Sequence, residues 1–107
     1  MSTIPPVELM IMSGPEDGLT ITLTGPKQGD AYIFGRREDC DVILGYDSQI
    51  SRNHARLFIK DGKWHVQDLG SRNGTYVGQQ KLESIAPLQP GQMFRIGRTW
   101  MRLQGSK

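Results

Sequence analysis

The clearest local signal in the chain lies at residues 50–75, which read ISRNHARLFIKDGKWHVQDLGSRNGT. Its middle part alternates apolar and polar residues on both sides of Asp61-Gly62, a dipeptide typical of tight β-hairpin turns. Two antiparallel strands joined by a tight turn bring their outer ends together. The sequence therefore predicts that the polar corners at residues 50–54 and 70–75 share one surface.

Further strands are predicted on both sides of this hairpin. Runs of alternating or β-branched apolar residues are separated by segments rich in Gly, Pro, Asp and Ser, as is typical of an all-β domain. The expected strands cover residues 7–12, 19–24, 31–34, 42–44, 55–60, 64–69, 75–77, 93–96 and 99–103. Residues 81–89 look irregular, and Pro87 and Pro90 exclude a long helix there. A third corner, residues 34–38, joins the other two if the chain forms a sandwich with its loops clustered at one end.

The composition limits the class of protein. The chain has 107 residues, of which 36% are hydrophobic and 22% charged, so it is too apolar for a disordered chain and fits one domain. A formal net charge of +2 is too small for a protein that coats nucleic acid non-specifically. One cysteine, Cys40, excludes an internal disulfide, and no apolar run approaches the about 18 residues of a membrane span. We therefore expect a cytoplasmic setting. We also expect one domain at residues 7–104, with short tails at 1–6 and 105–107.

The order and spacing of three short motifs resemble the forkhead-associated (FHA) domain family. The motifs are Gly35-Arg36, Ser51-Arg52-Asn53-His54 and Ser71-Arg72-Asn73-Gly74-Thr75. Each motif alone is weak evidence for the family. The resemblance covers nearly the whole chain, from about Val7 to Leu103. The resemblance implies an eleven-stranded β-sandwich whose loops at one end bind phosphothreonine peptides. It also implies a non-catalytic recognition module in Ser/Thr kinase signalling, with a phosphothreonine-containing protein as the partner and no cofactor.

Four residues are candidate phosphate ligands. A phosphothreonine carries roughly −1.5 to −2 charges at pH 7 and three acceptor oxygens, so its receptor needs cations and short donors on a fixed frame. Arg36 and Arg72 supply guanidinium groups, which can grip two oxygens at once. The resemblance implies that the hydroxyl of Ser51 donates to the phosphate and that Arg52 contacts phosphate or peptide. Taken alone, Ser51 could equally be an ordinary turn serine.

Six other residues are assigned to the peptide or to the frame. Asn73 can clasp a ligand backbone with its side-chain amide, although Asn73-Gly74 is also a typical left-handed turn. Gln49 lies where related domains often read the peptide three places after the phosphothreonine, and Arg37 is a rim charge. His54 is expected to brace the loop that carries the serine, and Gly35 and Gly74 serve backbone geometry.

Three other functions compete with this interpretation. Ser51, His54 and Asp68 are the residue types of a hydrolase triad, but the chain has no Gly-x-Ser-x-Gly elbow, and two isolated histidines with one cysteine do not make a metal site. Nucleic-acid binding would need aromatic side chains beside the arginines. A phosphorylation-independent module using the sheet face around Phe58 remains open. Thr3 could, when phosphorylated, compete for the domain's own site.

Overall fold

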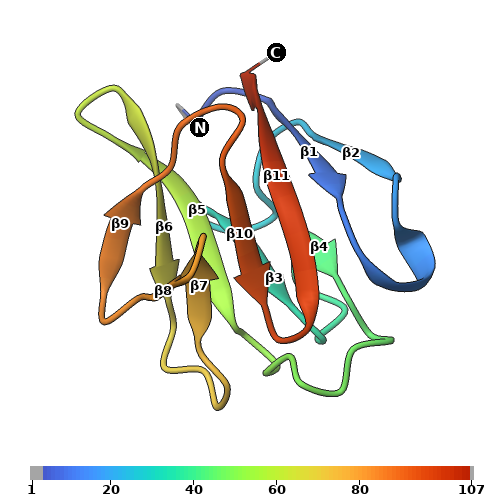
Figure 1. Cartoon of the computed structure of the whole chain (residues 1–107). Coiled ribbons are helices and arrows are strands. Elements are labelled where there is room, and N and C mark those ends of the chain that lie inside the picture. Colours follow the sequence, from blue (N-terminus) through green and yellow to red (C-terminus); the bar gives the residue numbers. More distant parts are fainter. Residues whose placement is uncertain (1–3, 107) are drawn as a thin grey trace.

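The chain folds into two β-sheets packed face to face (Figure 1). This computed structural model describes residues 4–106, so Thr3 and its proposed competition lie outside the described residues. A six-stranded sheet has the order β2-β1-β11-β10-β7-β8, and a five-stranded sheet has the order β4-β3-β5-β6-β9. The predicted all-β sandwich with eleven strands is confirmed. No helix among the described residues is long and apolar enough to cross a membrane.

The strands are short and follow the predicted order. Their bounds are β1 Val7–Ile11, β2 Thr20–Leu23, β3 Tyr32–Gly35, β4 Val42–Ile43, β5 Ala55–Lys60, β6 Lys63–Asp68, β7 Thr75–Val77, β8 Gln80–Lys81, β9 Ile85–Pro87, β10 Met93–Ile96 and β11 Thr99–Ser106. A single 3₁₀ turn, η1 at Gly14–Glu16, lies between β1 and β2. Strands β3 and β4 form the one parallel pair among the described strands.

The hairpin at the centre of the sequence forms as predicted. Strand β5 pairs with β6 from Ala55 opposite Asp68 to Lys60 opposite Lys63. Asp61 and Gly62 both have positive φ values, 54° and 74°, as a type I′ turn requires. Because the strands are antiparallel, the ends of the hairpin that carry the two polar motifs lie side by side.

The core lies between the two sheets. Alternate residues of the long strands are fully buried, so each strand presents one face inward. Phe34 of β3 and Phe94 of β10 meet edge to face across the layer, with ring centroids 5.7 Å apart. Tyr32 stacks near Trp64, and its hydroxyl donates to the carbonyl of Pro5 at 3.1 Å.

The chain ends are more structured than the expected tails. Ile4 is buried in the core cluster. Strand β11 continues to Ser106 because Val7 and Glu8 of β1 extend the ladder past a bulge between Glu8 and Leu9. The indole N–H of Trp64 then donates to the hydroxyl of Ser106 at 2.9 Å. These contacts keep residues 105 and 106 in the sheet.

Two local predictions hold only in part. Residues 82–84 and 88–89 are irregular as expected, but β8 pairs with β7 and β9 pairs with β6. Pro87 is tolerated in β9 because that strand is a sheet edge, where a missing N–H costs no ladder bond. The predicted buried run at 42–44 is also uneven, since Ile43 is 46% exposed while Val42 and Leu44 are buried.

Candidate functional site

The first and second corners touch through their backbones. The amide of Arg36 donates to the carbonyls of Ser51 at 3.3 Å and Arg52 at 3.1 Å, and the amide of Arg37 donates to Arg52 at 3.4 Å. A Cβ on Gly35 would lie 1.9 Å from the carbonyl oxygen of Arg52. Only glycine permits this approach. The absence of a side chain at Gly35 therefore sets how close Arg36 lies to the serine loop.

The second and third corners are joined by side chains. The amide of Arg72 donates to Oγ of Ser51 at 3.0 Å, and Nδ2 of Asn73 donates to the carbonyl of Gln49 at 2.8 Å. Since the Ser51 oxygen accepts from Arg72, its own hydrogen is available for another acceptor. The amide oxygen of Asn73 likewise accepts no hydrogen bond from the described residues. The three predicted corners thus form one continuous surface.

His54 is the buried link between the two motif loops. It is 0% exposed; its Nδ1 lies 3.0 Å from the amide of Ser51, and its Nε2 lies 2.8 Å from the carbonyl of Gly74. An amide can donate only to a nitrogen without a proton, so Nδ1 is the acceptor and Nε2–H the donor. Burial, opposed by the bond to Gly74 and the charge of Asp68, lowers the pKa of His54 below 6.5. The bridge therefore uses the neutral imidazole.

Asp68 organises the third corner. Its Oδ2 accepts from the amides of Gly70 at 3.0 Å and Ser71 at 2.9 Å. Its Oδ1 accepts from the hydroxyls of Ser71 and, at 2.7 Å, Thr75. Although burial alone would raise the pKa of Asp68, these hydroxyl and amide donors lower it below 3.8. Asp68 is therefore ionised at neutral pH, and both of its carboxylate oxygens accept hydrogen bonds that hold the loop.

The surface is cationic. Arg36, Arg37, Arg52 and Arg72 are all exposed. Among residues 4–106, the side chain of Arg37 pairs with Asp39 at 3.4 Å, whereas those of Arg36, Arg52 and Arg72 form neither an ion pair nor a hydrogen bond. Three arginines without an ion-pair partner among residues 4–106, on loops whose backbones bond to the Ser51 loop, make a surface suited to an anion with several oxygens.

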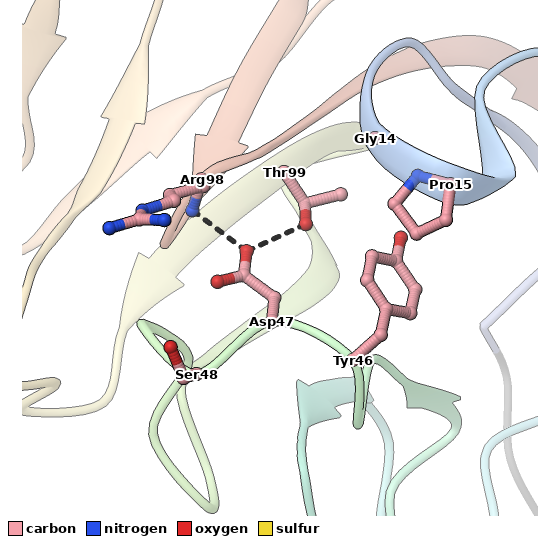
Figure 2. A pocket seen from close by; sticks show the side chains of 7 residues that line it. All are labelled: Gly14, Pro15, Tyr46, Asp47, Ser48, Arg98 and Thr99. Carbon is pink, nitrogen blue, oxygen red and sulfur yellow. Dashed lines mark hydrogen bonds between the residues drawn. The ribbon is translucent and has the colours of Figure 1, made fainter.

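Asp47, which sequence reasoning missed, holds the loop that carries Gln49. Asp47 is 6% exposed, and its carboxylate accepts from the amide of Gln49 at 2.9 Å. It also accepts from the amide of Arg98 and the hydroxyl of Thr99 at 2.8 Å each (Figure 2). Burial raises the pKa of Asp47, but these donors prevail and lower it below 3.8. The bond between Asp47 and the amide of Gln49, two residues on, is a local Asx turn that a sequence can indicate. The bonds that Asp47 accepts from Arg98 and Thr99 on the β10–β11 turn leave no local signal in the sequence.

Two cavities lie outside this surface. One of about 190 Å³ adjoins Asp47, between Tyr46, Pro15 and Thr99 (Figure 2). A larger one of about 540 Å³ is lined by Trp64, Leu88 and three prolines near the β5–β6 turn, at the opposite end of the hairpin from the motif loops. Neither cavity includes the arginines of the three corners, so the candidate site is an open surface formed by loops.

The geometry does not assemble a hydrolase triad. Nδ1 of His54 is occupied by the backbone amide of Ser51, while the Ser51 hydroxyl bonds to Arg72 instead. Asp68 approaches His54 Nε2 only to 3.9 Å. In the part of the chain that the structure describes, no three His, Cys, Asp or Glu side chains gather as a metal site.

Comparison with known proteins places this arrangement in a family. The FHA domain family model matches residues 32–97, and the chain belongs to the FHA domain family. It is 34% identical over 96 residues to the FHA domain-containing protein FhaB of Mycobacterium tuberculosis, covering 90% of this chain and 59% of that protein. The chain thus spans about three fifths of the length of this curated relative.

Solved structures with about a quarter of their residues identical to this chain share its fold. A domain solved for a structural and functional analysis of phosphothreonine-dependent FHA domain interactions is 26% identical, with a TM-score of 0.75, over 92% of this chain and 95% of that one. Mycobacterium tuberculosis EmbR, solved with a low-affinity phosphopeptide, is 25% identical with a TM-score of 0.80. The match covers 95% of this chain and 25% of EmbR.

Proposed function

We propose that the chain is a phosphothreonine-dependent, non-catalytic recognition module whose partner is a phosphorylated protein of a Ser/Thr kinase pathway. The observation that carries the proposal is that the backbones of Arg36 and Arg72 bond to Ser51, next to Arg52, while the side chains of these three arginines have no ion-pair partner among residues 4–106. The solved relatives support it, because one was analysed for phosphothreonine-dependent interactions and another binds a phosphopeptide.

The residues divide into two roles. Arg36, Ser51 and Arg72 hold the phosphate oxygens, because a dianion is bound best by charged forks together with a neutral donor. Arg52 adds charge or a backbone contact beside them. The free oxygen of Asn73 accepts from a peptide amide, while its nitrogen stays on Gln49. Gln49 and Arg37 then face the peptide residues next to the phosphothreonine.

The frame makes this arrangement rigid before the ligand arrives. Gly35, His54 and Gly74 do not contact the ligand in this scheme. Gly35 admits the close approach of Arg52, and His54 links the serine loop to Gly74. A surface whose donors are already oriented pays less ordering entropy on binding. Loop side chains on a fixed frame thus supply the specificity.

The test is titration of a degenerate phosphothreonine peptide library against the wild type and Arg36→Ala. Removing one partner of a charge-assisted contact costs about 2–5 kcal/mol, so the variant is expected to bind at least ~30-fold more weakly. Lys63→Ala removes an exposed cation at the far end of the hairpin and is the matched control, expected to bind as the wild type does. Phosphoserine and unphosphorylated libraries are titrated in parallel.

Normal binding by Arg36→Ala, or equal binding of phosphorylated and unphosphorylated libraries, would refute the proposal. The phosphorylation-independent alternative, which uses the sheet face around Phe58, would then gain support. In the structure that ring is partly covered, because the guanidinium carbon of Arg56 lies 4.4 Å from its centroid and His65 stacks at 5.9 Å.

A further inference from the structure

The outer face of the six-stranded sheet carries an unusual row of side chains. Arg95 of β10 pairs with Tyr76 of β7 on one side and with Trp100 of β11 on the other. Its guanidinium carbon lies 4.1 Å from the Tyr76 ring centroid and 5.7 Å from that of Trp100. The guanidinium group therefore lies within cation–π distance of both rings.

A second row lies directly beside the first. Arg102 of β11 pairs with Met93 of β10 and with Met10 of β1. All six side chains are partly exposed, whereas the alternating residues Phe94, Met101 and Leu103 are fully buried. The pleat of the sheet therefore turns both rows to solvent. We call this patch the arginine–methionine face; it consists of Met10, Tyr76, Met93, Arg95, Trp100 and Arg102.

This composition matches the centre of protein interfaces. Tyr, Trp, Met and Arg are enriched there, whereas Lys, Glu, Asp and Ser are depleted. Tyr, Trp and Arg also dominate the residues that carry most binding energy. A solvent-facing sheet surface in a small domain is ordinarily polar, as the exposed Thr20 and Thr22 of the neighbouring strand β2 are.

The charge of the face points to the kind of partner. Arg95 uses one nitrogen to bond the carbonyl of Gly97 at 2.7 Å, and Arg102 uses Nε to bond the side chain of Gln104 at 2.7 Å. Neither forms an ion pair within the described chain. Lys81, opposite Tyr76 at the sheet edge, adds a third cation. In the free domain water satisfies the remaining N–H donors of each partly exposed arginine, and a carboxylate from a partner would replace that water.

We propose that the arginine–methionine face binds a protein segment that presents carboxylates among apolar side chains. The apolar groups pack on Met10, Met93 and Trp100, and the carboxylates bond the free nitrogens of Arg95 and Arg102. A second copy of the chain fits poorly, because a two-fold contact would set the face against itself and none of its six residues carries a carboxylate. A nucleic acid fits poorly because base stacking needs the ring faces that Arg95 covers.

The proposal does not depend on phosphothreonine binding. The face lies on strands β1, β7, β10 and β11, whereas the proposed phosphate ligands lie on the loops after β3, β4 and β6. Failure at one surface therefore leaves the other testable. A single partner can also engage both, with its phosphorylated segment on the loops and a separate segment on the sheet.

The experiment is selection of a random, unphosphorylated 12-residue peptide library displayed on phage against the wild-type domain. Enriched peptides are synthesised and titrated against the wild type, Arg102→Glu, Met93→Glu and the control Lys63→Glu. We expect acidic and apolar residues to be enriched together, and affinity to fall at least 10-fold in the first two variants and less than 2-fold in the control. Thermal melts check folding, and two variants of different chemistry guard against one failing to fold.

Several results would overturn the proposal. These are no enrichment, enriched peptides without acidic residues, or affinity preserved in both Arg102→Glu and Met93→Glu. Concentration-dependent dimerisation that Arg102→Glu abolishes would assign the face to a second copy instead. Binding of a fluorescent single-stranded RNA 12-mer that the same variant abolishes would assign it to nucleic acid. Arg102→Glu and the control Lys63→Glu are also titrated with phosphothreonine peptides. Equal affinities of the two variants would show that the substitution on the sheet face leaves the phosphate surface intact.

Discussion

The contact between Gly35 and the serine loop yields the sharpest prediction. A methyl group on Gly35 would meet the carbonyl oxygen of Arg52 at 1.9 Å, its carbonyl carbon at 2.8 Å and Sγ of Cys40 at 2.9 Å. Carbon and oxygen atoms of neighbouring strands normally stay about 3.3 Å or more apart. Strand β3 or the loop after Ser51 must therefore move by roughly 1.4 Å to accept Gly35→Ala.

The energetic cost follows from where that movement occurs. The groups in the way are backbone atoms and a buried cysteine, which cannot swing aside as an exposed side chain can. Overpacking of this kind costs about 1–3 kcal/mol or more, and we expect Gly35→Ala to lie at or above 3 kcal/mol. For a domain of this size each kcal/mol lowers the melting temperature by about 4–8 °C. The expected loss is therefore at least ~12 °C.

Gly45→Ala is the matched control. A Cβ at Gly45 meets nothing within 4 Å, and this glycine is not among those with positive φ. The same substitution there is expected to be neutral or to stabilise by up to about 1 kcal/mol, because alanine lowers the entropy of the unfolded chain. Calorimetry or circular dichroism melts of both variants decide. Melting temperatures of the two variants within about 2 °C of each other would refute the claim that this close approach sets the loop position.

Three further predictions concern titration and buried acceptors. The pKa of His54 is lowered in the fold, so its contribution to stability is complete above its unfolded pKa of 6.5 and is lost as pH falls toward the lower folded pKa. Urea unfolding at a series of pH values should show the stability advantage of the wild type over His54→Gln shrink as pH falls. An advantage that stays constant with pH would contradict this role. Asp47→Ala leaves three donors without their acceptor and should cost about 2–4 kcal/mol, against less than about 0.5 for the exposed Asp39→Ala. Unfolding free energies of equal size would contradict a structural role for Asp47. Phosphopeptide affinity should weaken as pH falls below about 6, where the phosphate dianion gains a proton. Calorimetric titration giving a constant affinity from pH 7.5 to 5 would argue against dianion recognition.

The parts of the fold predictable from sequence are those with local signals. The β5–β6 hairpin is set by Asp61-Gly62 and by alternation over twelve residues, so its register could be anticipated. Strands β8 and β9 could not, because two and three residues are too few to show a period and their pairing depends on partners across the sheet. Pro87 even argues against β9 unless the strand is known to be an edge.

The same division holds for the site. That the corners around Ser51 and Arg72 meet follows from hairpin geometry, and the capping role of Asp68 follows from its place before a turn. The bond from Arg72 to Ser51 Oγ and the anchoring of Asp47 by Thr99 do not follow, because they join residues 21 and 52 positions apart. Likewise the stack of Arg95 on two rings arises from strand order, which a single sequence does not reveal.

The pairing of β1 with β11 bears on how the domain is made. Val7 lies opposite Ser106, so the first strand finds its neighbour only when the last strand has been synthesised. Strands β3, β5 and β6, in contrast, come from consecutive chain and carry the three motif corners at their ends. Pairing across long loops is slow because their entropy must be lost first. During translation the recognition loops can therefore begin to assemble on one sheet, while the other sheet stays open until β11 has left the ribosome.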